Sequence, residues 1–282
     1  MPSIGWLIDR SNYRIRAAVV PGMLLACLLA SGASILPLPT QAQTVIRSAQ
    51  SSVLQQQVRQ GLASVEQQGF NNDLDKQVAK AKVLVSVTGA SLAARAVPPA
   101  EAIMAIGVAA ISTGIPAPIV VATVSGAAFR SGVVPPDEVI ADTLRAAIAS
   151  RADGANGAAA VIVAALDARV AESAIGQGLS RAASSVWADN PAAAASIAQA
   201  VADEGTAMII GSFSLSVANA AGSAQLASIA NGPPRAAATG GGGGGLGGLG
   251  GINNLLNGIQ NLLNRIFDRI GLPPPCITPS CS

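Results

Sequence analysis

Histidine is absent from this 282-residue sequence, and aromatic and charged residues are scarce, at 2% and 11% of the chain. Without histidine and with only three cysteines, the chain lacks the usual ligands of a transition-metal site and the usual general base. The scarcity of aromatic side chains argues against stacking surfaces for bases or sugars. A formal charge of +2 is too small for a surface that neutralises nucleic-acid phosphates. We therefore expect no catalytic residues, no cofactor, no metal and no nucleic-acid partner.

Residues 1–42 have the composition of a secretory signal peptide. Three arginines within the first 16 residues precede an uncharged apolar run over 17–39, and small residues occupy the outer positions of Thr40-Gln41-Ala42. This order of basic, apolar and small residues is typical of a cleavable export signal. We expect cleavage after Ala42 and an exported protein of the periplasm, cell surface or extracellular space. The remaining chain carries equal numbers of basic and acidic residues.

Two alternatives for this N-terminus stay open. Leu24-Leu25-Ala26-Cys27 looks like a bacterial lipobox, in which Cys27 would be lipidated and become the first residue of a lipoprotein. The uncharged run over 17–39 is also long enough to cross a bilayer as an uncleaved signal anchor. Cleavage after Ala42 is the preferred interpretation because the apolar segment continues beyond Cys27.

The N-terminal helical segment comprises residues 43–96. Its first part, residues 44–70, is rich in glutamine and carries one apolar stripe at helical spacing. The stripe consists of Val45, Leu54, Val58, Leu62 and Val65. Asn71-Asn72-Asp73 follows, which predicts a turn that caps a second helix. On that second helix, Lys76, Lys80 and Lys82 are interpreted as a solvated face.

The Ala-rich region 97–235 contains regularly spaced helix-start signals. These are Pro98-Pro99, Pro116, Pro135-Pro136, Asp153-Gly154 and Asn190-Pro191. Their first residues are 18, 19, 18 and 37 residues apart, and Glu172-Ser173 lies near the middle of the last interval. Between them, alanine, the best helix former, alternates with Ile, Val or Leu at helical steps. We expect helices of about 13 residues joined by short turns.

The predicted fold class is all-α, with two architectures open. A pair of such helices has the length of a helical-repeat unit, which favours a solenoid-like array. The alternative is an irregular Ala-rich bundle of short helices, because side-chain identities repeat poorly.

Trp187 is expected to fill a gap between helices. The carboxylates Asp137, Glu138 and Asp142 are expected to complement the dipole at the start of one helix.

Two uncharged segments, 102–129 and 205–234, are long enough to cross a bilayer. Both are rich in small residues, and Pro116 and Pro118 interrupt the first. Within a span, proline leaves backbone groups in need of other partners. We expect buried helices of a water-soluble domain, and insertion into a membrane as helical hairpins is the alternative.

A glycine-rich linker, residues 236–251, precedes a predicted amphipathic helix over 252–271. Six consecutive glycines at 240–245 predict a flexible tether. The apolar stripe of the helix consists of Ile252, Leu255, Leu256, Ile259, Leu262, Leu263, Ile266 and Ile270. Because an isolated helix of this length is marginal in water, we expect the stripe to contact its own domain, a second copy, a protein partner or a membrane surface.

The Pro/Cys tail, residues 272–282, contains Cys276 and Cys281. In an exported chain, two cysteines this close together are expected to form a local disulfide.

The features of the sequence together predict a non-enzymatic structural or interaction protein of the cell envelope or extracellular space. A membrane-inserting or pore-forming helical protein is the alternative.

Overall fold

The computed structural model describes residues 40–70, 72–218, 220 and 222–232, and this part of the chain contains ten α-helices and no strand. The all-α prediction is therefore confirmed for the described residues. By its contacts the chain divides into residues 1–43 and residues 44–282. The packing described below lies within the second unit.

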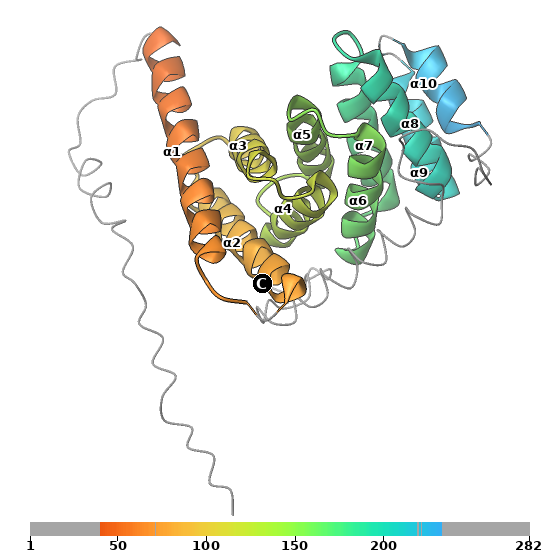
Figure 1. Ribbon diagram of the computed structural model, residues 1–282. Coiled ribbons are helices and arrows are strands. Elements are labelled where there is room, and N and C mark those ends of the chain that lie inside the picture. The colour runs from red at the N-terminus through yellow and green to blue at the C-terminus, as the bar shows by residue number, and fades with distance from the viewer. Residues whose placement is uncertain (1–39, 71, 219, 221, 233–282) are drawn as a thin grey trace, which may run out of the picture. The chain divides into compact units, whose positions relative to one another are not determined.

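Helix boundaries follow the signals in the sequence. The helices are α1 (Thr40–Glu66), α2 (Asp73–Ala94), α3 (Pro99–Ser112), α4 (Ala117–Ser131), α5 (Pro136–Ala149), α6 (Gly154–Asp167), α7 (Glu172–Val186), α8 (Pro191–Glu204), α9 (Ala207–Val217) and α10 (Ser223–Ala230) (Figure 1). From α3 to α8 each helix has 14 or 15 residues, and their first residues follow one another at steps of 18 or 19. The predicted start signals, including Glu172, are thus confirmed.

Local chemistry explains why helices begin at these positions. Proline occupies the first turn of α3, α5 and α8, where its missing N–H would have had no partner within the helix. At the starts of α2, α6, α8 and α9, the side chains of Asn72, Asp153, Asn190 and Thr206 accept a hydrogen bond from a backbone N–H of the first turn. Such caps stabilise a helix by about 1 kcal/mol each.

The helix ends repeat in their backbone dihedral angles. Arg95, Gly132 and Arg169 follow α2, α4 and α6 at intervals of 37 residues, with φ of 51°, 61° and 55°. Gly114 and Arg151 follow α3 and α5, again 37 residues apart, with φ of 87° and 60°. Each of these helices therefore ends at a left-handed residue, a common way to terminate a helix. The 37-residue period is visible in the backbone although the residue type varies between glycine and arginine.

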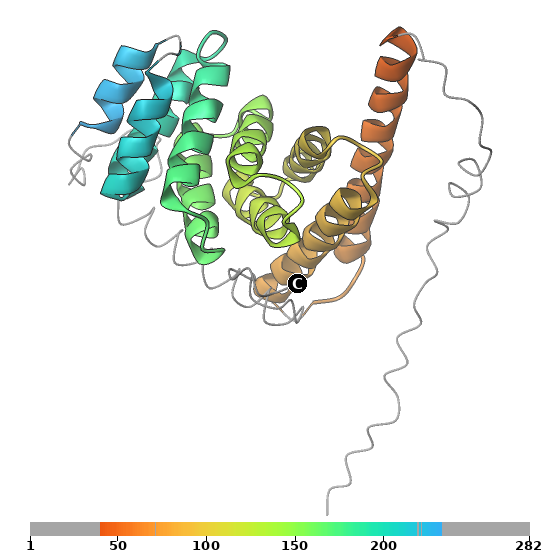
Figure 2. The ribbon, with the colours of Figure 1, turned by 180° about the vertical axis from the view of Figure 1, so that it is seen from behind.

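Alternate helices pack side by side in two layers. One layer contains α3, α5, α7 and α9, and the other contains α2, α4, α6, α8 and α10 (Figure 1). Figure 2 shows the same helices from behind. Consecutive helices contact each other between the layers. Helix α2, within the segment that the sequence sets apart as N-terminal, contacts α4 as α4 contacts α6. We refer to α2–α10 as the two-layer domain.

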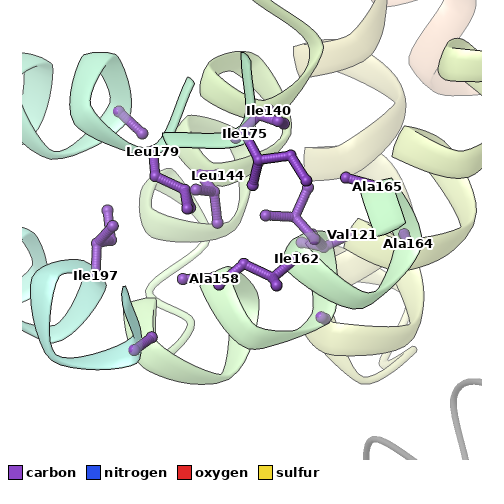
Figure 3. Packing of buried hydrophobic residues seen from close by; sticks show 14 of the residues in the cluster. Val121, Ile140, Leu144, Ala158, Ile162, Ala164, Ala165, Ile175, Leu179 and Ile197 are labelled. Atoms are coloured by element: carbon purple, nitrogen blue, oxygen red, sulfur yellow. The ribbon is translucent and has the colours of Figure 1, made fainter. Parts of the chain in front are cut away.

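Small and medium-sized apolar side chains fill the space between the layers. Figure 3 shows Ile140 and Leu144 of α5 and Ile175 and Leu179 of α7 gathered with Ile162 of α6, and each is at most 1% exposed. Ala158, Ala164 and Ala165 of α6 lie among them, with Val121 of α4 and Ile197 of α8. Burial stabilises by about 25 cal/mol per Å² of apolar area, so an interior this rich in alanine depends on many small contacts.

Two glycines of α7 permit an unusually close approach to the neighbouring helices. A Cβ atom added at Gly176 would lie 2.6 Å from the carbonyl oxygen of Ile209 in α9. A Cβ atom added at Gly178 would lie 2.7 Å from the Cβ atom of Ile140 in α5. Helix α7 therefore meets α9 on one side and α5 on the other at distances that only glycine allows.

Helix α1 buries its predicted stripe. Leu54, Val58 and Leu62 share a buried cluster with Leu84 and Ile103 of the next two helices. Val65 is also buried, and the side chain of Val45 lies outside the described part of α1.

The interpretation of the lysines on α2 as a solvated face needs correction for two of them. Glu66, the last residue of α1, forms ion pairs with Lys76 and, at 2.5 Å, with Lys80. Hydrogen bonds from these two ammonium groups hold the pKa of Glu66 below its usual value. Lys76 and Lys80 thus connect α2 to the end of α1.

Both uncharged segments are divided between helices. The segment 102–129 falls in α3 and α4, and the described part of 205–234 falls mainly in α9 and α10. Among the described helices, none has both the length and the hydropathy required to cross a membrane.

Trp187, directly after α7, packs against the backbone of Gly222 before α10, so it fills a gap between helices as predicted.

Candidate functional site

The residues predicted to make the contacts of this protein lie outside the described part of the chain. The stripe over 252–270, the pair Cys276 and Cys281, and Cys27 all belong to residues 1–39 or 233–282. The contact helix, the disulfide and the lipidation alternative therefore stay predictions. The candidate site described here belongs to the two-layer domain.

A polar hollow of about 480 Å³ opens on the layer of α5, α7 and α9. Its lining consists of Asp137, Arg145, Gln177, Ser180, Arg181, Ser184, Ser185, Ser216 and Ala220. Most of these residues come from α7, the central helix of the three, and the rest come from α5, α9 and the turn that follows α9. The hollow exists because α7 packs against both α5 and α9.

Arg181 of α7 connects its helix to the start of α5. Its guanidinium lies 2.9 Å from the carboxylate of Asp137 and 3.6 Å from that of Glu138. Both carboxylates lie in the first turn of α5, where the helix dipole also favours negative charge, as predicted. The Arg181 side chain is 48% exposed, so these ion pairs contribute little to stability and mainly orient the guanidinium.

Arg145 of α5 lies beside a buried carboxylate. It lies 2.9 Å from Asp142 on the same helix, and its Nε atom donates a hydrogen bond of 3.0 Å to the Oγ atom of Ser185 in α7. Asp142 is only 4% exposed. Burial raises the pKa of Asp142, while the charge of Arg145 acts in the opposite direction. Asp142 therefore positions Arg145 at the cost of a buried negative charge.

Two serines of α7 bring buried groups to the lining of the hollow. Ser180 is 3% exposed, and the Oγ atom of Ser184 is buried without a hydrogen-bond partner. A buried hydroxyl without a partner costs about 1–3 kcal/mol of stability. Arg181 already engages Asp137, the only carboxylate residue in the lining. The arrangement suits hydrogen bonding to a polar group better than activation of a serine as a nucleophile.

The sequence did not indicate that Arg145 and Arg181 belong together. Each is followed by two alanines, and the two arginines are 36 residues apart, which is also the step between the first residues of α5 and α7. Equivalent positions on stacked helices lie side by side, so this spacing was the available signal. Recognising it required the knowledge that α5 packs on α7 rather than only on α6.

Within residues 40–70, 72–218, 220 and 222–232, no three Asp, Glu or Cys side chains gather as metal ligands would. No protein-family model, curated protein or solved structure matches this chain at a significant level.

Proposed function

We propose that this chain is an exported, non-enzymatic interaction protein built on a solenoid-like helical array. The observation that supports this proposal is the contact between alternate helices, whose first residues from α3 to α8 are 36 or 37 residues apart. Stacking of this kind is typical of helical repeats, which present extended surfaces to their partners. The export part of the proposal comes from the signal-like residues 1–42.

The polar hollow is the proposed contact surface of the array. Arg145 and Arg181 present guanidinium groups held in place by carboxylates, and serines of α7 line the hollow beside them. Such a surface favours a protein segment that supplies carbonyl or carboxylate oxygens, because guanidinium groups are strong, well-oriented donors. The segment 252–271 provides a second, apolar contact in this proposal.

Crosslinking in the native compartment tests the contact role. We expect R181A to leave the array folded, because the ion pairs of Arg181 are exposed, and to lose crosslinks to a partner protein. R59A, a change of an exposed arginine on α1, should keep them. Deletion of residues 246–282 should change the oligomeric state or the set of crosslinked partners. If R181A and the deletion of residues 246–282 both keep the crosslinked partners and the oligomeric state of the unaltered protein, the proposed function is wrong.

Fractionation and mass spectrometry of the isolated protein test export. An N-terminus at Gln43 in the periplasmic or extracellular fraction would support cleavage after Ala42, whereas a lipidated Cys27 would support the lipoprotein alternative. Flotation with liposomes and dye release test the membrane-inserting alternative. Dye release by the processed protein would favour insertion over the proposed scaffold.

A further inference from the structure

The layer of α3, α5, α7 and α9 ends, among the described residues, in an apolar face of α9. Met208 and Leu215 on this face are 63% and 79% exposed. Between them lies Gly211, where an added Cβ atom would meet open space. We call these three residues the open face of α9. No charged side chain occurs over 205–232 to solvate it.

The open face is in register with the face of α7 on which α9 itself packs. Gly176 is the fifth residue of α7 and lies against the backbone of α9. Gly211 is the fifth residue of α9, and the ninth residues of the two helices are Ser180 and Leu215. The open face of α9 is therefore the surface on which the next helix of the layer would pack.

The opposite end of the layers shows how this chain finishes a stack. Helix α1 turns its apolar stripe inward and leaves Gln56, Gln57 and Gln60 exposed on its outer face. Terminal units of helical arrays need such a polar outer face for solubility. Met208 and Leu215 do not provide one.

The segment 252–270 combines an apolar face with a polar face, whereas the open face of α9 is apolar. Its apolar stripe of leucine and isoleucine would cover Met208 and Leu215, and its other face is rich in asparagine and glutamine, with Arg265, Asp268 and Arg269. In this respect it matches α1, which has an apolar face and a glutamine-rich face.

The described chain ends close to α9. The Nδ2 atom of Asn231 donates a hydrogen bond of 2.8 Å to the Oγ atom of Ser214, so the described chain ends beside the residue that precedes Leu215. Residues 233–251 follow, and 19 residues of a glycine-rich chain span about 24 Å on average. This distance exceeds the length of α9, about 16 Å at 1.5 Å per residue. A linker of this length is sufficient for the segment to reach the open face, where the tether would give it a high effective concentration.

We propose that segment 252–270 packs, within its own chain, on the open face of α9 and takes the place of the next helix in this layer. This proposal rests on the proposed function, in which the segment makes an apolar contact. It specifies that the segment makes this contact with the array of its own chain. The segment is then a terminal cap, and the polar hollow stays available for a partner.

Photocrosslinking of the full processed protein identifies the occupant. A benzophenone amino acid at position 215 should crosslink to residues 252–270, and the same probe at Val53, which is 54% exposed on α1, should not. In a mixture of isotopically light and heavy chains, the crosslinks should join residues of one chain. Crosslinks only between chains, only in the presence of vesicles, or to other segments would overturn the proposal.

Thermal unfolding of full-chain variants provides an independent readout. L215D should lower the unfolding midpoint, and in a chain that also carries I259D and L263D it should cause no further loss. An equal loss in both backgrounds, or no loss in either, contradicts the proposal. G211A should likewise lower the unfolding midpoint. G89A, at a helical glycine with open space around it, should raise the midpoint. A rise of the midpoint with G211A would also contradict the cap.

These measurements separate the cap from the function. Intrachain crosslinks from position 215 together with unchanged partner crosslinks in R181A would retain the cap and reject the polar hollow as the partner surface. Loss of partner crosslinks in R181A without crosslinks to 252–270 would retain the interaction role and reject the cap.

Discussion

Arg130 of α4 and Asp167 of α6 form an ion pair of 3.1 Å although 37 residues separate them. Each is the fourteenth residue of its helix, so stacking in register brings opposite charges together at the same turn of neighbouring helices. Arg130 also donates a hydrogen bond to the carbonyl oxygen of Gly126. Burial lowers the pKa of Arg130, and the charge of Asp167 opposes this effect.

The first prediction concerns the energy of this pair. R130M should destabilise the domain by about 1–3 kcal/mol, because it removes a partly buried, charge-assisted hydrogen bond from Asp167. In a double-mutant cycle with D167N, urea denaturation should reveal a coupling of about 0.5–3 kcal/mol. Additive effects of the two substitutions would show that the ion pair does not hold α4 and α6 in register.

The second prediction concerns the left-handed helix ends. Arg151 and Arg169 occupy positive φ where Gly114 and Gly132 stand one period earlier. R151G and R169G should each stabilise the protein by about 0.5–1 kcal/mol, because glycine adopts this conformation without steric cost. R59G, at an exposed helical position in α1, is the control and should destabilise by about 1 kcal/mol. Destabilisation in all three variants would contradict the argument.

The third prediction concerns the close approach of α7 and α9. G176A should destabilise the domain by about 1–3 kcal/mol, because its Cβ atom would lie 2.6 Å from the carbonyl oxygen of Ile209. This loss opposes the gain of up to about 1 kcal/mol that alanine brings to a helix. Chemical denaturation measures the difference, with G89A as the matched control that keeps only the gain. An increase in stability with G176A would mean that the two helices do not pack this closely.

The fourth prediction concerns the pH dependence of stability. Burial raises the pKa of Asp142 above its ordinary value of 3.8, so the folded state binds the proton more tightly than the unfolded state does. The resulting contribution to stability is complete below pH 3.8 and is lost as the pH rises through the folded-state pKa. D142N does not titrate, so its stability relative to the unaltered protein should increase as the pH rises above 3.8. Denaturation curves recorded across this range measure the change, and a constant difference would rule out the raised pKa.

Much of the fold follows from local signals. Pro99, Pro136 and Pro191 begin helices because proline is tolerated only in their first turn, and Asn72 caps α2 because its side chain satisfies a free backbone N–H. The buried stripe of α1 follows from the helical spacing of its apolar residues. Each of these effects involves residues only a few positions apart, so the sequence is sufficient to predict it.

The candidate site could not be predicted in the same way. The sequence indicated the carboxylates Asp137 and Asp142 as partners of a helix dipole, but the ion pair of Asp137 with Arg181 depends on α5 packing beside α7. Asp142 pairs instead with Arg145, three residues later on the same helix. Likewise, the ion pairs of Lys76 and Lys80 depend on the position of Glu66 at the end of α1.

The sequence alone determined that this chain is helical, where most of its helices begin and how long they are, because capping, proline geometry and alanine propensity act within one turn. Tertiary structure decided that helices two apart in the chain become neighbours, that Gly176 meets the backbone of α9, and that no described helix covers Met208 and Leu215 of α9. These features depend on distances between residues about 36 positions apart. Many weak contacts among small side chains set those distances together, and no local pattern specifies them.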